Sequence, residues 1–312
     1  MRDYFIIGSR GSKLALWQSE WVRARLRESR PEAEIRIEII KTSGDVMLNV
    51  PLATIGGKGV FTKELEEALL AGQIDLAVHS LKDLPTTLPD NLAITAITER
   101  EDARDALVLP EGVASDDDSL GGLPRGAIVG TSSLRRQAQL KHLRTDVQIK
   151  DLRGNVDTRL RKLDEGGYDA IILASAGLRR LGFERRINAA IGHGEMLPAV
   201  GQGALGIETR AGDARTAALV SLLDHAPTRA ACTAERSLLH ALGGGCQVPI
   251  AAHASISGDT LHLEALVAAL NGEQVIRDVL EDESTHAARA GETLAARLRA
   301  RGAETLLAGL TV

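Results

Sequence analysis

The sequence predicts an α/β protein with a small α+β domain at its C-terminal end, and three observations support this prediction. Strand-like apolar runs alternate with helical patterns over the first two thirds of the 312 residues, as in βαβ units with a mostly parallel sheet. The order strand, glycine, hydroxyl-rich turn and helix occurs at 6–12 and again at 128–133, which indicates two similar α/β domains. Beyond residue 243, alternating runs separated by turn signals are typical of an antiparallel sheet.

The first α/β set contains short apolar runs and longer segments with apolar residues at helical spacing. These patterns predict strands at 4–7, 35–40 and 74–78, and helices at 12–26 and 61–70. The second set begins near Ala106. It predicts strands at 127–129, 147–152 and 170–174, and helices at 134–143 and 156–163.

The C-terminal part begins with a predicted helix at 227–242, which three consecutive glycines end. Three alternating runs follow at 248–256, 261–269 and 274–280, and Asn271-Gly272 is a strong hairpin signal between the last two. A final helix is predicted at about 285–307. These elements predict a three-stranded antiparallel sheet with helices.

Composition excludes several classes of function. The chain has 37 basic and 42 acidic residues and only 2% aromatic residues, which argues against a nucleic-acid partner. It has no apolar run of about 18 residues and no export signal at the N-terminus, so we expect a cytoplasmic protein with no membrane partner. The two cysteines lack the spacing of a zinc site, and no metal site is predicted.

Arginines are concentrated where predicted strands end and helices begin. Ligands of open α/β sheets lie at the carboxyl ends of the strands, and a cation in the first helical turn opposes the helix dipole. Repeated cations at this edge therefore predict an anionic ligand held by guanidinium groups, with solvated surface arginines as the alternative. These residues are Arg10, Arg135, Arg136, Arg153, Arg159, Arg179 and Arg180.

Asp83 follows the strand at 74–78 and lies at the same predicted edge. A carboxylate facing an arginine-lined cleft can act as a general acid or base or stabilise a cation, whereas the alternative is a simple ion pair with Lys82. Ser12 and Ser132 are expected mainly as helix N-caps whose hydroxyls could also hold a carboxylate. Lys58 lies in a glycine-rich segment that lacks the ending of a P-loop, and we expect a mobile loop there.

The two cysteines differ in their predicted surroundings. Cys232 lies inside the predicted helix at 227–242 and is expected to be a buried core thiol. Cys246 follows three glycines, so its thiol should be reachable and could carry a covalently attached group. No Cys-His-Asn arrangement that would make it a protease nucleophile is apparent.

Seven segments in one order across nearly the whole chain resemble the porphobilinogen deaminase family, also called hydroxymethylbilane synthases. They are IGSRGSKLA at 7–15, GGKGVF at 56–61, HSLKDLP at 79–85, GTSSLRRQ at 130–137, LRGNV at 152–156, PAVGQGAL at 198–205 and GCQVP at 245–249. The resemblance implies two domains similar to type II periplasmic binding proteins with the active site between them, and a third domain. We expect domain 1 at 1–101 and 199–221, domain 2 at 102–198 and domain 3 at 222–312.

The resemblance also implies an activity. The family joins four molecules of porphobilinogen, with loss of ammonia, onto a covalently bound dipyrromethane primer and then releases hydroxymethylbilane by hydrolysis. Each pyrrole brings an acetate and a propionate, which guanidinium groups bind well. Ammonia loss leaves an electron-poor azafulvene, which a carboxylate near the ring nitrogen stabilises. The family resemblance favours a monomer, and a non-catalytic cytoplasmic protein that binds a carboxylate or oxyanion is the alternative.

Residue by residue, Asp83 matches the family's catalytic aspartate, and Cys246 matches the cysteine that holds dipyrromethane through a thioether. The residues that match the cofactor- and substrate-binding arginines are Arg10, Arg135, Arg136, Arg153, Arg159 and Arg180. Secondary candidates for binding are Ser12, Lys58, Lys82, Ser132 and Gln202.

Overall fold

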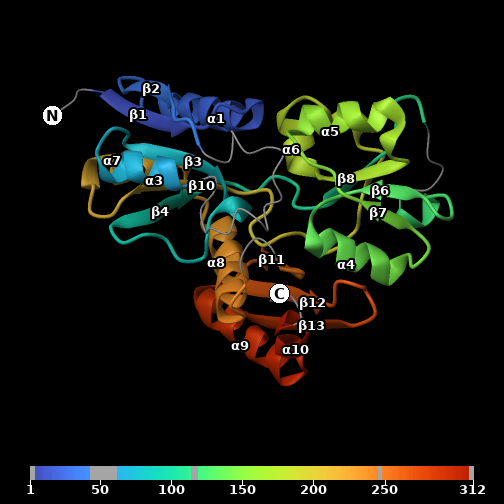
Figure 1. The fold of residues 1–312 in the computed structure, drawn as a ribbon. Coiled ribbons are helices and arrows are strands. Elements are labelled where there is room, and N and C mark those ends of the chain that lie inside the picture. The colour runs from blue at the N-terminus through green and yellow to red at the C-terminus, as the bar shows by residue number, and fades with distance from the viewer. Residues whose placement is uncertain (1–3, 43–61, 114–118, 245–247, 309–312) are drawn as a thin grey trace. The chain divides into compact units, whose positions relative to one another are not determined.

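The chain forms two compact units in the computed structural model (Figure 1), which describes residues 4–42, 62–113, 119–244 and 248–308. Unit 1 is Met1–Glu101 with Ala204–Arg229, and unit 2 is Asp102–Gly203 with Ala230–Val312. Each unit is described by itself below. The expected boundaries of three domains stay a prediction.

Unit 1 contains a five-stranded sheet in the order β2-β1-β3-β10-β4. Its strands are β1 (Tyr4–Ser9), β2 (Glu34–Ile39), β3 (Leu76–Ser80), β4 (Leu92–Ile97) and β10 (Leu205–Arg210). Its helices and short helical turns are α1 (Lys13–Ser29), α3 (Lys63–Leu70), η1 (Leu81–Asp83), α7 (Ala214–Val220) and η5 (Ser221–Leu223). Apolar residues of α1 and α7 pack on one face, and those of α3 pack on the other, so the central strands are buried on both sides.

Unit 2 contains a second five-stranded sheet in the order β7-β6-β8-β5-β9. Its strands are β5 (Asp105–Val108), β6 (Ile128–Gly130), β7 (Gln148–Lys150), β8 (Ala170–Ala174) and β9 (Ala189–Ala190). Its helices and helical turns are η2 (Leu120–Gly122), α4 (Leu134–Leu143), α5 (Val156–Lys162), η3 (Leu163–Gly167), α6 (Ser175–Arg180) and η4 (Glu184–Arg186).

The two five-stranded sheets have the same pattern of strand directions, which confirms the prediction of two similar α/β domains. In each, the second strand of the sheet order runs parallel to both its neighbours. Four of the five strands in each sheet run in one direction, in line with the prediction of mostly parallel sheets; the reversed strands, which the prediction missed, are β10 and β5, each antiparallel to both strands beside it. A strand that does not follow its neighbour through a βαβ crossover is not constrained to run parallel to it, and neither strand follows its neighbours in this way.

The C-terminal part has the predicted three-stranded antiparallel sheet, in the order β11-β12-β13. Its elements are α8 (Ala226–Ala241), β11 (Ile250–Ser257), β12 (Thr260–Ala268), β13 (Val275–Glu283), η6 (Ser284–His286), α9 (Ala287–Ala300) and α10 (Ala303–Ala308). The single final helix predicted at 285–307 was wrong, since Gly302 has a φ of 98° that ends α9 before α10 begins. Cys232 is fully buried in α8, as predicted.

No helix within the described ranges is both long enough and apolar enough to cross a membrane.

Candidate functional site

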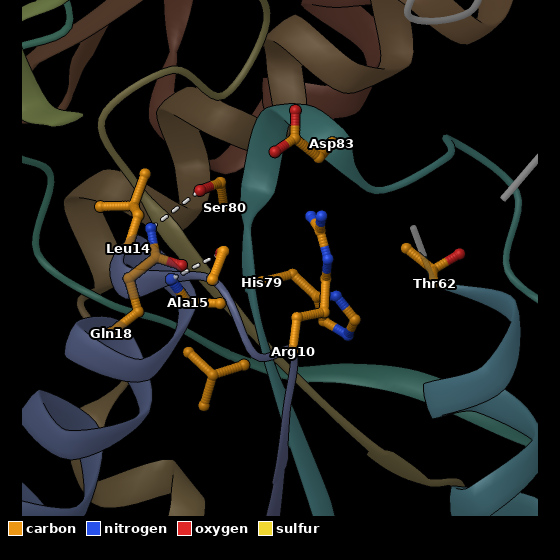
Figure 2. A pocket seen from close by; sticks show the side chains of 10 residues that line it. Arg10, Leu14, Ala15, Gln18, Thr62, His79, Ser80 and Asp83 are labelled. Carbon is orange, nitrogen blue, oxygen red and sulfur yellow. Dashed lines mark hydrogen bonds between the residues drawn. The ribbon is translucent and has the colours of Figure 1, made fainter. Parts of the chain in front are cut away.

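A pocket in unit 1 lies where β1 and β3 end and α1 begins (Figure 2). This is the carboxyl edge of two parallel strands, where the sequence predicted a ligand site. The residues that line the pocket are Arg10, Ser12, Leu14, Ala15, Gln18, Thr62, Val78, His79, Ser80 and Asp83. The structure therefore brings together Arg10, Ser12 and Asp83, three residues that the sequence analysis had named.

Two hydrogen bonds hold the start of α1 against this edge. Ser12 is the N-cap, as expected, and its Oγ accepts from the backbone nitrogen of Ala15 at 3.3 Å. The side-chain amide of Gln18 donates to Oγ of Ser80 at the end of β3 over 2.9 Å. The first turn of α1 holds no acidic residue, so the dipole of the helix favours an anion in the pocket.

Arg10 and Asp83 give the pocket one cationic and one acidic side chain. Arg10 is half-buried and extends from the end of β1 in the direction of η1, which carries Asp83 (Figure 2). Asp83 is exposed, and Lys82 precedes it on the same turn. Such a pair can bind a carboxylate at the guanidinium and accept an N–H at the carboxylate within one small site.

Unit 2 holds a second cluster, in which Arg135 and Arg136 share the buried carboxylate of Asp105. Arg135 Nη1 donates to Asp105 Oδ2 at 2.7 Å, and Arg136 Nη2 donates to Asp105 Oδ1 at 2.7 Å. The side-chain amide of Gln202 donates to the same Oδ1 at 2.8 Å. Both arginines are only 5% exposed, and Asp105 is fully buried. The sequence analysis had named Arg135, Arg136 and Gln202 as candidates. It had missed Asp105, the carboxylate that joins them.

The charge balance of this cluster fixes the ionisation of Asp105. Burial alone would raise the pKa of Asp105, but the guanidinium groups of Arg135 and Arg136 outweigh it and hold that pKa well below its ordinary value. One carboxylate between two guanidinium groups leaves the cluster with a net positive charge. Asp105 thus supplies a partner inside the protein for cations that the sequence analysis had assigned to a ligand, and contact with a ligand stays a prediction for both arginines.

Arg136 retains capacity for a further partner. Its Nη1 donates to the backbone oxygen of Ile172 at 2.9 Å, but its buried Nε has no hydrogen-bond partner in the described part of the chain. A buried donor without an acceptor is costly, so this atom fits a site that is completed by an anion.

The other predicted binding residues of unit 2 are held by backbone contacts. The expectation that Ser132 is an N-cap was wrong, because Ser133 holds that position before α4. The Ser132 hydroxyl instead donates to the backbone oxygen of Leu152 and accepts from its nitrogen, both at 3.1 Å, which ties together the segments that follow β6 and β7. Arg159 Nε donates to the backbone oxygen of Gly154 at 2.7 Å, and Arg180 Nη2 donates to that of Gly203 at 2.5 Å. Arg153 is half-buried just before α5.

Two predicted site residues, Lys58 and Cys246, lie outside the described residues, and their roles stay predictions. Over the described ranges, no group of three or more His, Cys, Asp and Glu side chains is placed to hold a metal ion.

Asp105 is the site residue that the sequence analysis missed. The only local signal was its place at the end of a charged stretch before a strand. Its partners lie 30 and 31 residues further along the chain, and only the folded sheet brings them to it.

Two family models match the chain. The model described as "Porphobilinogen deaminase, dipyromethane cofactor binding domain" covers residues 5–218, and "Porphobilinogen deaminase, C-terminal domain" covers residues 229–300.

Curated relatives match over nearly the whole length. Porphobilinogen deaminase from Chlorobium phaeovibrioides is 50% identical over 311 residues, with 98% of each chain covered. The protein of the same name from Moorella thermoacetica is 52% identical over 301 residues, which cover 96% of this chain and 95% of that protein.

Solved structures with a more distant likeness include two substrate-binding domains. The second substrate-binding domain of a putative amino acid ABC transporter from Streptococcus pneumoniae is 14% identical, with a TM-score of 0.45 and coverage of 77% of this chain and 94% of that one. Substrate-binding domain 2 of Lactococcus lactis GlnP is 12% identical, with a TM-score of 0.44 and coverage of 78% and 91%. On the family models and the full-length relatives, the chain belongs to the porphobilinogen deaminase family.

Proposed function

We propose that this chain is a transferase that condenses four molecules of porphobilinogen, with loss of ammonia, and releases hydroxymethylbilane. The observation that carries this proposal is the identity of about half of all residues with porphobilinogen deaminases over nearly the full length of both chains. The distant likeness to substrate-binding domains does not favour the alternative of a non-catalytic carboxylate-binding protein, because it is weak and concerns the fold alone.

The described residues fit a dipyrromethane group, which carries carboxylates and pyrrole N–H groups. Arg10 and the start of α1 offer donors to a carboxylate, and Arg136 Nε is a buried donor that lacks a partner. Asp83 offers an acceptor to a pyrrole N–H. When bound, this group supplies the pyrrole carbon to which the first substrate is joined.

The further cationic candidates for holding carboxylates act by charge and by paired N–H donors. They are Arg135, Arg153, Arg159 and Arg180, with Lys58, Ser12, Ser132 and Gln202 as secondary groups.

Asp83 is the proposed catalytic residue. Positive charge develops at the ring nitrogen of porphobilinogen when ammonia leaves, and a carboxylate within reach of that nitrogen stabilises the charge and moves the N–H proton. The exposed position of Asp83 in a pocket with Arg10 supports this role, since Arg10 can bind a carboxylate of the same ring. Lys82 supports Asp83 as a neighbouring cation.

The point of covalent attachment is proposed to be the sulfur of Cys246, through a thioether. Support comes from the GCQVP segment at 245–249 and from the burial of the other cysteine, Cys232, which no attached group of that size could reach. We also propose that the protein is a monomer in the cytoplasm.

Replacing Asp83 tests the catalytic assignment. Asp83→Asn removes the charge and keeps the shape, so we expect turnover of porphobilinogen to fall by about 100- to 10,000-fold. The mass of the intact purified variant should differ from that of the wild type only by the change from Asp to Asn, because the attached dipyrromethane group is retained. Asp90→Asn, at another exposed aspartate of unit 1, is the matched control and should keep normal turnover. Near-normal rates in Asp83→Asn would refute the role.

A further inference from the structure

Three ionisable side chains are buried in the interior of unit 1, behind the wall of the candidate pocket. They are His79 on β3, Glu208 on β10 and Glu66 on α3, with exposed fractions of 6%, 0% and 8%. His79 Nε2 lies 3.0 Å from Glu208 Oε2. His79 also lines the pocket that contains Arg10 and Asp83 (Figure 2). The cluster, here called the His79–Glu208–Glu66 cluster, therefore reaches from the core to the pocket wall.

Strand register places the three groups together. Glu208 pairs with Ala77, which is two residues before His79, so both side chains project from the same face of the sheet. Helix α3 covers this face through Leu65 and Ala68, which pack in one core with Ala77. Glu66 lies between these two residues and is turned inward rather than to solvent.

Among the described residues, neither carboxyl group of the cluster pairs with Arg or Lys. Oε1 of Glu208 and Oε1 of Glu66 are buried without a hydrogen-bond partner there, and the one close ionisable neighbour of Glu208 Oε2 is the imidazole of His79. A carboxyl group that is buried away from cations is costly to ionise. Burial raises the pKa of Glu66 and outweighs the hydrogen bond of Thr62, which lowers that pKa; the neighbouring Glu208 raises it further, and His79 lowers it by less.

We propose that Glu66, a buried carboxyl group with an unpartnered oxygen, keeps a proton at neutral pH, and that its cluster with His79 and Glu208 controls how strongly the adjoining pocket attracts carboxylates. The control of carboxylate binding rests on the proposed function, which supplies the carboxylate-bearing substrate. His79 and Glu66 are positioning residues, because they act through the charge of the pocket wall.

The other charged groups that the structure describes on the elements packed around the cluster are the following. Arg10 follows β1 and Asp83 follows β3, and both face the pocket. Asp75 before β3 and Arg210 on β10 pair with each other at 3.2 Å, and Lys63 and Glu67 on α3 pair at 3.8 Å. Strand β4 has no charged residue. The remaining acid on α3 is Glu64, of which one carboxylate oxygen is also buried.

A pH dependence of substrate binding follows from this arrangement. As the pH rises, loss of the Glu66 proton adds a negative charge behind the pocket, which repels the substrate carboxylates. At a separation of roughly 10 Å and an effective dielectric constant of about 20, one added charge weakens binding by about tenfold. The KM for porphobilinogen should therefore rise about tenfold through this transition, with a much smaller change in kcat.

The first arm of the test does not depend on activity. Infrared spectra of the holoenzyme in H2O and D2O should show the C=O band of a buried protonated carboxyl at pH 7, and that band should disappear on raising the pH. Glu66→Gln should lack the band, whereas Glu67→Gln, at the exposed neighbour on the same helix, should keep it. Absence of the band in the wild type overturns the proposal, and this measurement needs no folded variant.

The second arm measures KM and kcat from pH 6.5 to 9 for the wild type, Glu66→Gln and Glu67→Gln. The KM of Glu66→Gln should stay flat, since its neutral side chain cannot lose a proton, while the other two rise together. Parallel KM profiles for all three proteins would overturn control of the pocket by the cluster. Wild-type protein with the infrared band and no turnover would instead count against the proposed function.

Discussion

Asp105 is buried between two guanidinium groups, and removing its charge would leave both of them without their carboxylate. Its contacts with Arg135 and Arg136 are both 2.7 Å long and lie out of reach of solvent. Such a cluster does not by itself add much stability, because bringing its charges out of water is costly. Its effect on stability is revealed when one partner is removed.

Asp105→Asn should lower the free energy of unfolding by about 3–5 kcal/mol at pH 7, since it leaves two buried cations with no counter-charge. Urea unfolding of the wild type and the variant measures this difference. The exposed Asp151→Asn of the same unit is the control and should change the free energy by less than about 0.5 kcal/mol. A loss below about 1 kcal/mol in Asp105→Asn would show that the carboxylate is not the counter-ion of the cluster.

The same pair of proteins should respond differently to acid. The pKa of Asp105 is lower in the folded state than in the unfolded state, so its stabilisation is present above the ordinary carboxyl pKa and is lost as the pH falls through the folded value. The difference in the free energy of unfolding between the wild type and Asp105→Asn should therefore become smaller in strong acid. The pKa of Glu66 is raised instead, so its contribution to stability is lost as the pH rises.

At the scale of single residues, features set by neighbours in the sequence could be predicted, whereas pairings between distant residues could not. The hydroxyl of Ser12 before an apolar helix predicted the cap, and the apolar face around Cys232 predicted a buried thiol; both are confirmed. The partner of Arg135 is set by which strand, β5, lies beside β8 in the sheet. No local pattern specifies that neighbour, so Asp105 was missed.

At the scale of elements, periodicity predicted the helices and strands that have a clear apolar pattern. Helix α4 and strand β8 begin and end at the predicted residues. The sequence analysis did not delimit β4, β5, β9 and β10, because short buried strands lack the alternation that marks a half-buried one. Since β5 and β10 are the antiparallel strands, missing them also left the one reversed strand of each sheet unpredicted.

Helices α8 and α9 approach each other closely at Gly291 in unit 2. A Cβ atom at this position would clash with the backbone oxygen of Ala234 and lie 2.8 Å from the backbone nitrogen of Leu238. Helix backbone cannot yield as a side chain can, so Gly291→Ala should lower the free energy of unfolding by about 1–3 kcal/mol despite the better helix propensity of alanine.

Thermal and urea unfolding check this expectation against Gly194→Ala, where the added methyl group meets open space. Equal stability of Gly291→Ala and wild type would mean that the two helices are not in contact at this point.

At the scale of the whole molecule, the proposed activity needs an acid, a set of cations and an attachment point on one chain. Unit 1 supplies Asp83 with Arg10, and unit 2 supplies the cluster of Arg135, Arg136 and Gln202 with Asp105. The family could be identified from seven ordered segments because they span nearly the whole sequence, and the comparisons confirm it. The attachment of a pyrrole group to Cys246 remains to be tested.

The mass of the intact protein tests the central claim most directly. Protein made with porphobilinogen available should be heavier than its sequence by two condensed pyrroles, and added substrate should raise the mass in equal steps of one porphobilinogen less ammonia. Cys246→Ser should show the bare mass of its sequence. A bare mass for the wild type, or an excess that survives in Cys246→Ser, would contradict a primer held by this sulfur.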